Sequence, residues 1–118
     1  MGPFSEGFGV RRPLRMLAYK LELDRTQVEQ LARILDELKT ERAQAAVDDR
    51  RTLADFADAL TGEQFDNAKA SAGGDRRTQS SQRLRDAVVR ALGQIHAMLN
   101  PEQRAKFAYM IRTGVLQV

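Results

Sequence analysis

Residues 24–61, DRTQVEQLARILDELKTERAQAAVDDRRTLADFADALT, contain no glycine and no proline. Apolar side chains in this stretch recur at the spacing of one face of an α-helix. They are Val28, Leu31, Leu35, Leu38, Leu53, Phe56 and Leu60. Between Leu38 and Leu53 the same face carries polar or small residues. The stretch predicts one helix of about 35 residues. A helix of this length needs a packing partner, because propensity alone does not stabilise it.

A second long helix is expected from about Gly62 to Met98, with Phe65 and Ala68 at its start. The apolar residues that close it at helical spacing are Leu84, Val88, Leu92, Ile95 and Leu99. Gly73 and Gly74 lie in its middle. Two adjacent glycines cost a helix about 2 kcal/mol relative to alanine, so we expect a kink, a frayed stretch or a local break there.

Two short helices complete the predicted fold. One covers about residues 13–22, with Pro13 in its first turn, and the other covers Pro101 to Arg112, with Gly114 as its C-cap. The Gly-rich residues 1–11 predict a flexible arm, and residues 12–118 predict a single domain. The fold class is therefore all-α: two long antiparallel helices that turn back at Thr61 and Gly62, flanked by two short ones.

The net charge of +3 is unevenly distributed along the chain. Residues 24–66 carry six basic and eleven acidic side chains, a net charge of −5, whereas residues 67–118 carry nine basic and three acidic, a net charge of +6. In a hairpin the acidic helix would lie against the basic one. This pairing accounts for the basic half without a nucleic-acid partner, and we expect none.

Composition limits the chemistry of the chain. The 118 residues include no cysteine and one histidine, which excludes disulfides, thiolate chemistry and a His-rich metal site. We find no Ser-His-Asp grouping and no Gly-rich phosphate loop. Asp55 and Asp58 lie three residues apart, but on an exposed helix nothing would shift their pKa values. We therefore expect neither an enzyme nor a cofactor.

One local pattern occurs three times: Leu23-Asp24-Arg25-Thr26-Gln27, Leu60-Thr61-Gly62-Glu63-Gln64 and Leu99-Asn100-Pro101-Glu102-Gln103. Each has a helix-capping residue with glutamine three positions later, the arrangement of a capping box. Taken singly, each pattern is a helix start with no further role. The second marks the turn between the long helices, where it is either a cap or a chance match.

In these motifs the sequence resembles the CpxP/Spy-like proteins, the LTxxQ-motif group that also contains periplasmic heavy-metal sensors. That family carries Leu-Thr-x-x-Gln near the start of the first long helix and again before the last helix. Here both copies keep leucine and glutamine, and Asp24 and Asn100 replace the threonine. The resemblance covers about residues 12–113. It implies a four-helix hooked hairpin that pairs into an antiparallel homodimer. The motif residues that it assigns are Leu23, Asp24, Gln27, Leu99, Asn100 and Gln103.

The resemblance implies either an ATP-independent chaperone that holds unfolded clients or an accessory of a sensor protein. Long side chains that combine charge with apolar stems are the candidates for client contact. They are Arg15, Met16, Arg42, Arg50, Arg51, Arg76, Arg77, Arg83, Arg85 and Met110. The alternative for each arginine is solvated surface or pairing within the hairpin. A hairpin with a polar middle leaves apolar surface for a second copy to cover, so we expect a homodimer on physical grounds as well.

A heavy-metal-responsive sensor of nickel, cobalt, zinc or copper is the alternative function. His96 is its weak candidate ligand, because Met98 two residues later lies on a different helix face and residue 100 is an asparagine. We expect no metal. Residues 1–20 lack the apolar stretch of a signal peptide, and no apolar run is long enough to span a bilayer. From the resemblance we expect a periplasmic location, which requires a leader or a membrane anchor ahead of Met1, and a cytoplasmic one stays open.

Overall fold

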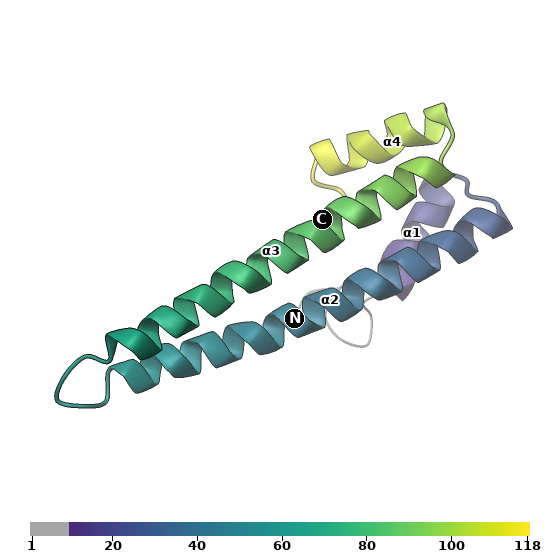
Figure 1. The fold of residues 1–118 in the computed structure, drawn as a ribbon. Helices are drawn as coiled ribbons and strands as arrows, with labels where there is room; N and C mark the ends of the chain where they lie inside the picture. Colours follow the sequence, from purple (N-terminus) through teal and green to yellow (C-terminus); the bar gives the residue numbers. More distant parts are fainter. Residues whose placement is uncertain (1–9) are drawn as a thin grey trace. The chain divides into compact units, whose positions relative to one another are not determined.

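The computed structural model describes residues 10–118, in which four helices and no strands occur (Figure 1). The helices are α1 (Arg11–Lys20), α2 (Arg25–Ala59), α3 (Asn67–Met98) and α4 (Pro101–Arg112). The predicted all-α class is confirmed, as is a first long helix of 35 residues. The helix predicted for about 13–22 begins earlier, at Arg11. Most of the predicted arm, residues 1–9, lies outside the described residues.

The chain divides into two compact units. Within the described residues, unit 1 comprises 10–39 and 88–118, and unit 2 comprises 40–87. All four helices contribute to the core of unit 1. Its buried apolar side chains are Leu17, Leu21, Leu31, Ile34, Leu38, Ala91, Ile95, Leu99, Phe107, Met110 and Leu116. Unit 1 therefore holds the large aliphatic and aromatic core residues, whose burial is the main stabilising term in folding.

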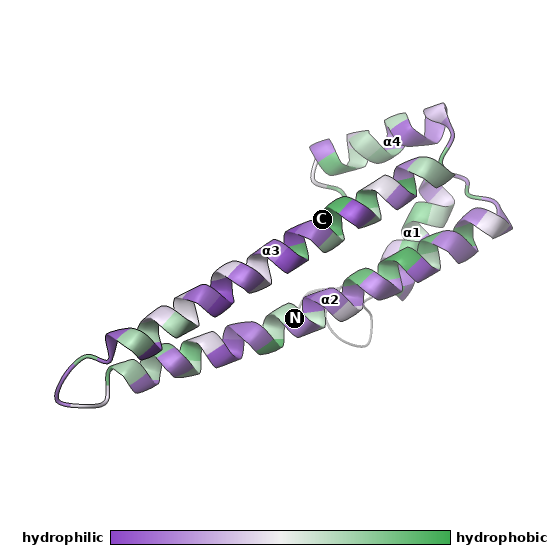
Figure 2. Cartoon of the chain, in the orientation of Figure 1, coloured by the Kyte–Doolittle hydropathy of each residue, from purple (hydrophilic) through white to green (hydrophobic). Residues whose placement is uncertain are grey.

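Unit 2 packs α2 against α3 through small and polar residues. Thr52 and Ala59 on α2 are buried, as are Gly73, Ser80 and Ala87 on α3. On each helix these residues are seven positions apart, which is the repeat that keeps one seam facing a partner helix. Figure 2 shows hydrophilic and hydrophobic residues mixed along both long helices on the side that it presents. Small side chains let the two backbones approach closely. Because small and polar side chains have little apolar area, this packing buries little apolar surface.

This close packing overturns two predictions. Leu53 and Leu60, predicted to rejoin the apolar seam, are 52% and 71% exposed, because the buried face runs through the neighbouring small residues. Helix α3 continues without a break through Gly73 and Gly74. A Cβ atom at Gly73 would lie 3.1 Å from the Cβ of Asp55 and from the Phe56 ring. The lack of a side chain at Gly73 is therefore what allows the helices to approach.

The chain turns back through Thr61 and Gly62 as predicted, but the predicted start of the second long helix is wrong. Helix α3 begins at Asn67, five residues after the expected start, and Phe65 is exposed in the preceding loop. The Thr61 hydroxyl donates to the carbonyl oxygen of Asp58 at 3.0 Å, at the end of α2. Asp66 caps α3 instead, since its Oδ1 accepts the backbone N–H of Lys69 at 3.0 Å. The pattern at Leu60 is thus a chance match.

Helix α4 has the predicted bounds: it ends at Arg112, Thr113 is its C-cap, and Gly114 follows. Gly114 has a φ of +81°, a left-handed conformation that glycine adopts readily. After this turn the N–H of Leu116 donates to the carbonyl oxygen of Met110 at 3.0 Å, and Leu116 is buried. The C-cap is therefore Thr113 and not the predicted Gly114, which forms the left-handed turn one position later.

Candidate functional site

Both motif copies that the resemblance assigned are complete capping boxes. At the start of α2 the N–H of Gln27 donates to Asp24 Oδ1 at 2.8 Å, and the N–H of Asp24 donates to Gln27 Oε1 at 3.0 Å. At the start of α4 the same two bonds join Gln103 and Asn100, again at 2.8 and 3.0 Å. The oxygens of Asp24 and Asn100 accept as a threonine hydroxyl would, so the missing threonines do not disrupt the caps.

The two motif glutamines also bind each other, which the sequence did not indicate. Gln27 Nε2 donates to Gln103 Oε1 at 2.9 Å, and Gln103 Nε2 donates to Gln27 Oε1 at 3.2 Å. Each Nε2 has a second acceptor, the carbonyl oxygen of Met98 for Gln27 and of Leu21 for Gln103. We call this group, Gln27, Gln103 and their hydrogen-bond partners, the glutamine clasp.

The glutamine clasp joins four helix ends within unit 1. Leu21 follows α1 and Met98 ends α3, while Gln27 and Gln103 lie in the first turns of α2 and α4. Carbonyls at the C-terminal end of a helix lack partners within it, and here the glutamine amides supply them. The motif therefore serves as a structural joint, and we assign it no catalytic role.

Ion pairs cross unit 2 from α2 to α3. Asp48 pairs with Arg83 at 3.0 Å, Asp49 with Arg77 at 3.4 Å, Asp58 with Lys69 at 3.9 Å, and Asp55 with Arg76. Residue numbers fall on α3 as they rise on α2, so the helices are antiparallel. The expectation that the acidic helix lies against the basic one is confirmed in this unit. Each exposed ion pair contributes little to stability by itself. The pair of Asp48 differs from the others because Asp48 is only 5% exposed.

The environment of Asp48 favours its charged form. The side-chain amide of Gln44 donates to Asp48 Oδ1 at 3.1 Å and is the largest influence on this carboxyl. Burial acts in the opposite direction, while the Ser80 hydroxyl and the positive charge of Arg83 reinforce the effect of Gln44. The net result is a pKa of Asp48 below its ordinary value. Close by on α2, the hydroxyl of the fully buried Thr52 has no hydrogen-bond partner.

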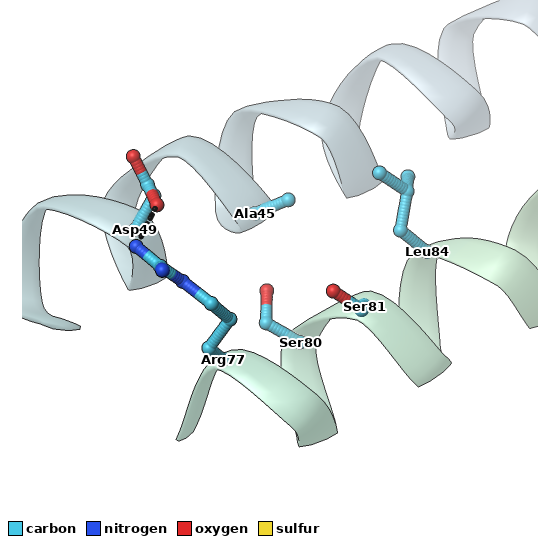
Figure 3. A pocket seen from close by; sticks show the side chains of 6 residues that line it. All are labelled: Ala45, Asp49, Arg77, Ser80, Ser81 and Leu84. Atoms are coloured by element: carbon cyan, nitrogen blue, oxygen red, sulfur yellow. Dashed lines mark hydrogen bonds and ion pairs between the residues drawn. The ribbon is translucent and has the colours of Figure 1, made fainter. Parts of the chain in front are cut away.

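A shallow hollow lies between the two helices of unit 2, with a volume of about 120 Å³. Figure 3 shows Arg77 reaching across to Asp49, and Ser80 and Ser81 of α3 near Ala45 of α2. Leu84 completes the lining. The hollow is smaller than the roughly 300–1,000 Å³ of typical small-molecule sites. Its lining offers one ion pair and two hydroxyls, so this hollow is not an organised site for a metabolite.

Comparison with known families gives a match over most of the chain. The sequence model of the LTXXQ motif family protein matches residues 10–110, which include both motif copies. The chain belongs to the LTXXQ motif family. This family includes the CpxP/Spy-like proteins, as the motif residues indicated. Comparisons with curated proteins and with solved structures give no match.

In this LTXXQ motif family protein the candidate contact residues have different environments. Arg76, Arg77 and Arg83 hold the ion pairs across unit 2, and Arg85 pairs with its neighbour Asp86 at 2.7 Å. Four others are exposed, namely Arg15, Arg42, Arg50 and Arg51, and Met16 is half-buried. Met110 is only 6% exposed, in the core of unit 1. Its assignment to client contact was wrong, because the apolar face of α4 packs inward at this position.

Exposed apolar side chains are the surface feature that sequence reasoning missed. In unit 2 they include Leu53, Leu60 and Phe65, all three of which had been expected in the hairpin core. Val47 is also exposed on α2, at 37%. The seven-residue repeat of small residues on both helices was the signal that could have placed the core on a different face.

The metal candidate His96 lies exposed near the end of α3. Its carbonyl oxygen accepts a hydrogen bond from Arg104 Nε at 2.9 Å. Between Val10 and Val118 no three His, Cys, Asp or Glu side chains are grouped closely enough to hold a metal ion. Across the same residues, no helix has both the length and the apolar character that a bilayer span requires.

Proposed function

We propose that this protein is an ATP-independent chaperone or sensor-accessory protein of the bacterial envelope, acting in the periplasm on unfolded or partner proteins. Membership of the LTXXQ motif family supports this function. The observation that carries the proposal is the exposure of Leu53 and Leu60 on the same helix as Arg42 and Arg50. Neither arginine forms an ion pair within the described part of the chain.

Such a surface suits loose, reversible binding. Apolar side chains contribute about 25 cal/mol for each Å² that they remove from water, so a few exposed leucines give modest affinity. Arginine adds both charge and an apolar stem that can follow an irregular client surface. Because the polar packing of unit 2 already places these side chains outside, no ATP-driven conformational change is needed to expose them.

Exposed apolar side chains of unit 1, among them Tyr19, Tyr109 and Val115, support the proposal that the protein is also a homodimer. In a closed two-fold dimer the same patch on both copies becomes buried, which would cover surface that one chain leaves in contact with water. Sedimentation equilibrium over a range of concentrations tests this part of the proposal. A single species with the mass of one chain at all concentrations would exclude the dimer.

Suppression of client aggregation tests the chaperone function. We expect the protein, in several-fold excess, to reduce light scattering by a thermally unfolding client without added nucleotide. The double variant Leu53→Gln with Leu60→Gln should lose most of this effect, whereas Val89→Gln, at an exposed apolar residue of α3, should retain it. Absence of suppression by the wild-type protein would overturn the chaperone proposal.

A further inference from the structure

Helix α2 carries a second heptad seam that no other part of the described chain covers. Its members follow one another at alternating spacings of three and four residues. They are Ala43, Ala46, Arg50, Leu53, Ala57 and Leu60. All six are exposed, and they are distinct from Thr52 and Ala59, which α3 covers. We call these six residues the outer seam.

The spacing of the outer seam is that of a coiled-coil interface. Alternation of three and four residues averages 3.5 per turn, which keeps one stripe facing a second helix. Leu53 and Leu60 are seven residues apart and provide the large side chains, while the alanines between and before them leave room for close approach. The outer seam therefore suits a helix as its partner. An extended segment would not need this heptad spacing.

Charge indicates which kind of helix fits. Arg50 lies within the outer seam and Arg42 beside its start, and no ion pair joins either to a described residue. The neighbouring acid, Asp49, is already paired with Arg77. The outer seam itself contains no acidic residue, so a second copy of it would offer Arg50 no carboxylate. A partner that buries Arg50 must therefore supply a carboxylate to pair with it.

We infer that the outer seam docks an amphipathic helix of another protein that carries an acidic side chain opposite Arg50. This inference rests on the proposed function and specifies the class of its partner. The apolar residues of the docked helix would cover Leu53 and Leu60, and its carboxylate would neutralise Arg50 where the interface excludes water. The acid would select among helices of similar hydropathy, because a neutral or basic residue there leaves Arg50 buried without a partner.

The experiment measures binding of synthetic helical peptides to the full chain by fluorescence anisotropy. The probe has leucines at heptad positions and one glutamate on its apolar face, and a matched peptide has lysine in place of that glutamate. We expect Arg50→Glu to weaken binding of the glutamate peptide at least tenfold and to strengthen binding of the lysine peptide. Leu53→Gln should also weaken binding, while Arg90→Glu and Val89→Gln, exposed changes on α3 and outside the outer seam, should leave it within about twofold.

The other outcomes distinguish a failure of the docking inference from a failure of the chaperone proposal. Equal binding of a scrambled peptide, with the heptad spacing removed, would show a general surface for unfolded segments and leave the chaperone proposal intact. A self-association that Leu53→Gln abolishes would assign the outer seam to a second copy of this chain. Failure of the glutamate peptide to bind, with aggregation suppression retained, would overturn the docking and not the proposed function. Peptide docking without suppression would overturn only the chaperone activity.

Discussion

Gln27 and Gln103 lie 76 residues apart in the chain and exchange hydrogen bonds between their side-chain amides. Every hydrogen-bonding position of these two groups is used. Each Nε2 donates once to the other glutamine and once to a backbone carbonyl, and each Oε1 accepts from the other glutamine and from its own capping residue. A fully satisfied polar network of this kind rigidifies its surroundings. Glutamate could not replace either residue, because it lacks both donors.

The first prediction concerns the glutamine clasp. Gln27→Ala and Gln103→Ala should each lower the free energy of unfolding by about 2 kcal/mol, since each removes a cap interaction and leaves buried polar groups without partners. The double variant should lose about 1 kcal/mol less than the sum, because the shared bonds can be lost only once. Urea unfolding measures this cycle, with Gln94→Ala as the control at an exposed glutamine. Strict additivity would show that the two side chains do not interact in solution.

The second prediction concerns pH. The pKa of Asp48 is lowered by folding from its ordinary value of 3.8, so the folded chain binds this proton less readily than the unfolded chain. The stability that Asp48 contributes is therefore present above that value and is lost as the pH falls through the lowered pKa. Urea unfolding between about pH 6 and pH 2 should show Asp48→Asn with a flatter pH profile than the wild-type protein. Asp75→Asn, at an exposed carboxylate without an ion pair in the described chain, should keep the wild-type slope.

The third prediction compares adjacent glycines. A Cβ atom at Gly74 would meet nothing within 4 Å, so Gly74→Ala should raise the free energy of unfolding by about 1 kcal/mol through helix propensity. At Gly73 the same atom would press on the Asp55 Cβ and the Phe56 ring, and crowding costs about 1–3 kcal/mol. Gly73→Ala should therefore be neutral or destabilising. Thermal unfolding of both variants checks this, and equal stabilisation would mean that the helices do not approach as described.

The helices and their caps could be predicted because they depend on neighbouring residues. Capping boxes, Gly114 and the length of α2 follow from spacings within a few turns of helix. The bond between Gln27 and Gln103 could not, since it requires knowledge of which helix ends meet in the fold. The sequence offers two capping residues before α3, Thr61 and Asp66. In the structure Asp66 caps α3, whereas the Thr61 hydroxyl donates to the end of α2.

The buried face of unit 2 was mispredicted for a physical reason. Hydropathy patterns assume that the largest apolar residues are inside. In unit 2 the helices instead pack through Gly73, Ser80 and Ala87 against residues such as Thr52, while Leu53 and Leu60 remain exposed. The charge distribution still predicted which helices pair, because it does not depend on which face of α2 turns inward. The outer seam, on which we base the docking proposal, exists because small residues are buried in unit 2 while large apolar residues are exposed.

The fourth prediction concerns the end of α4. Gly114 has a φ of +81°, and in the left-handed region a Cβ atom costs about 1–2 kcal/mol. Gly114→Ala should lower the free energy of unfolding by about that amount, because the turn must be kept for Leu116 to remain buried. Gly93→Ala is the matched control, since its Cβ would lie in open space within α3 and should raise stability by about 1 kcal/mol. Opposite signs for the two variants in urea unfolding are expected. If Gly114→Ala were also stabilising, the left-handed turn would not be a fixed feature of the folded chain.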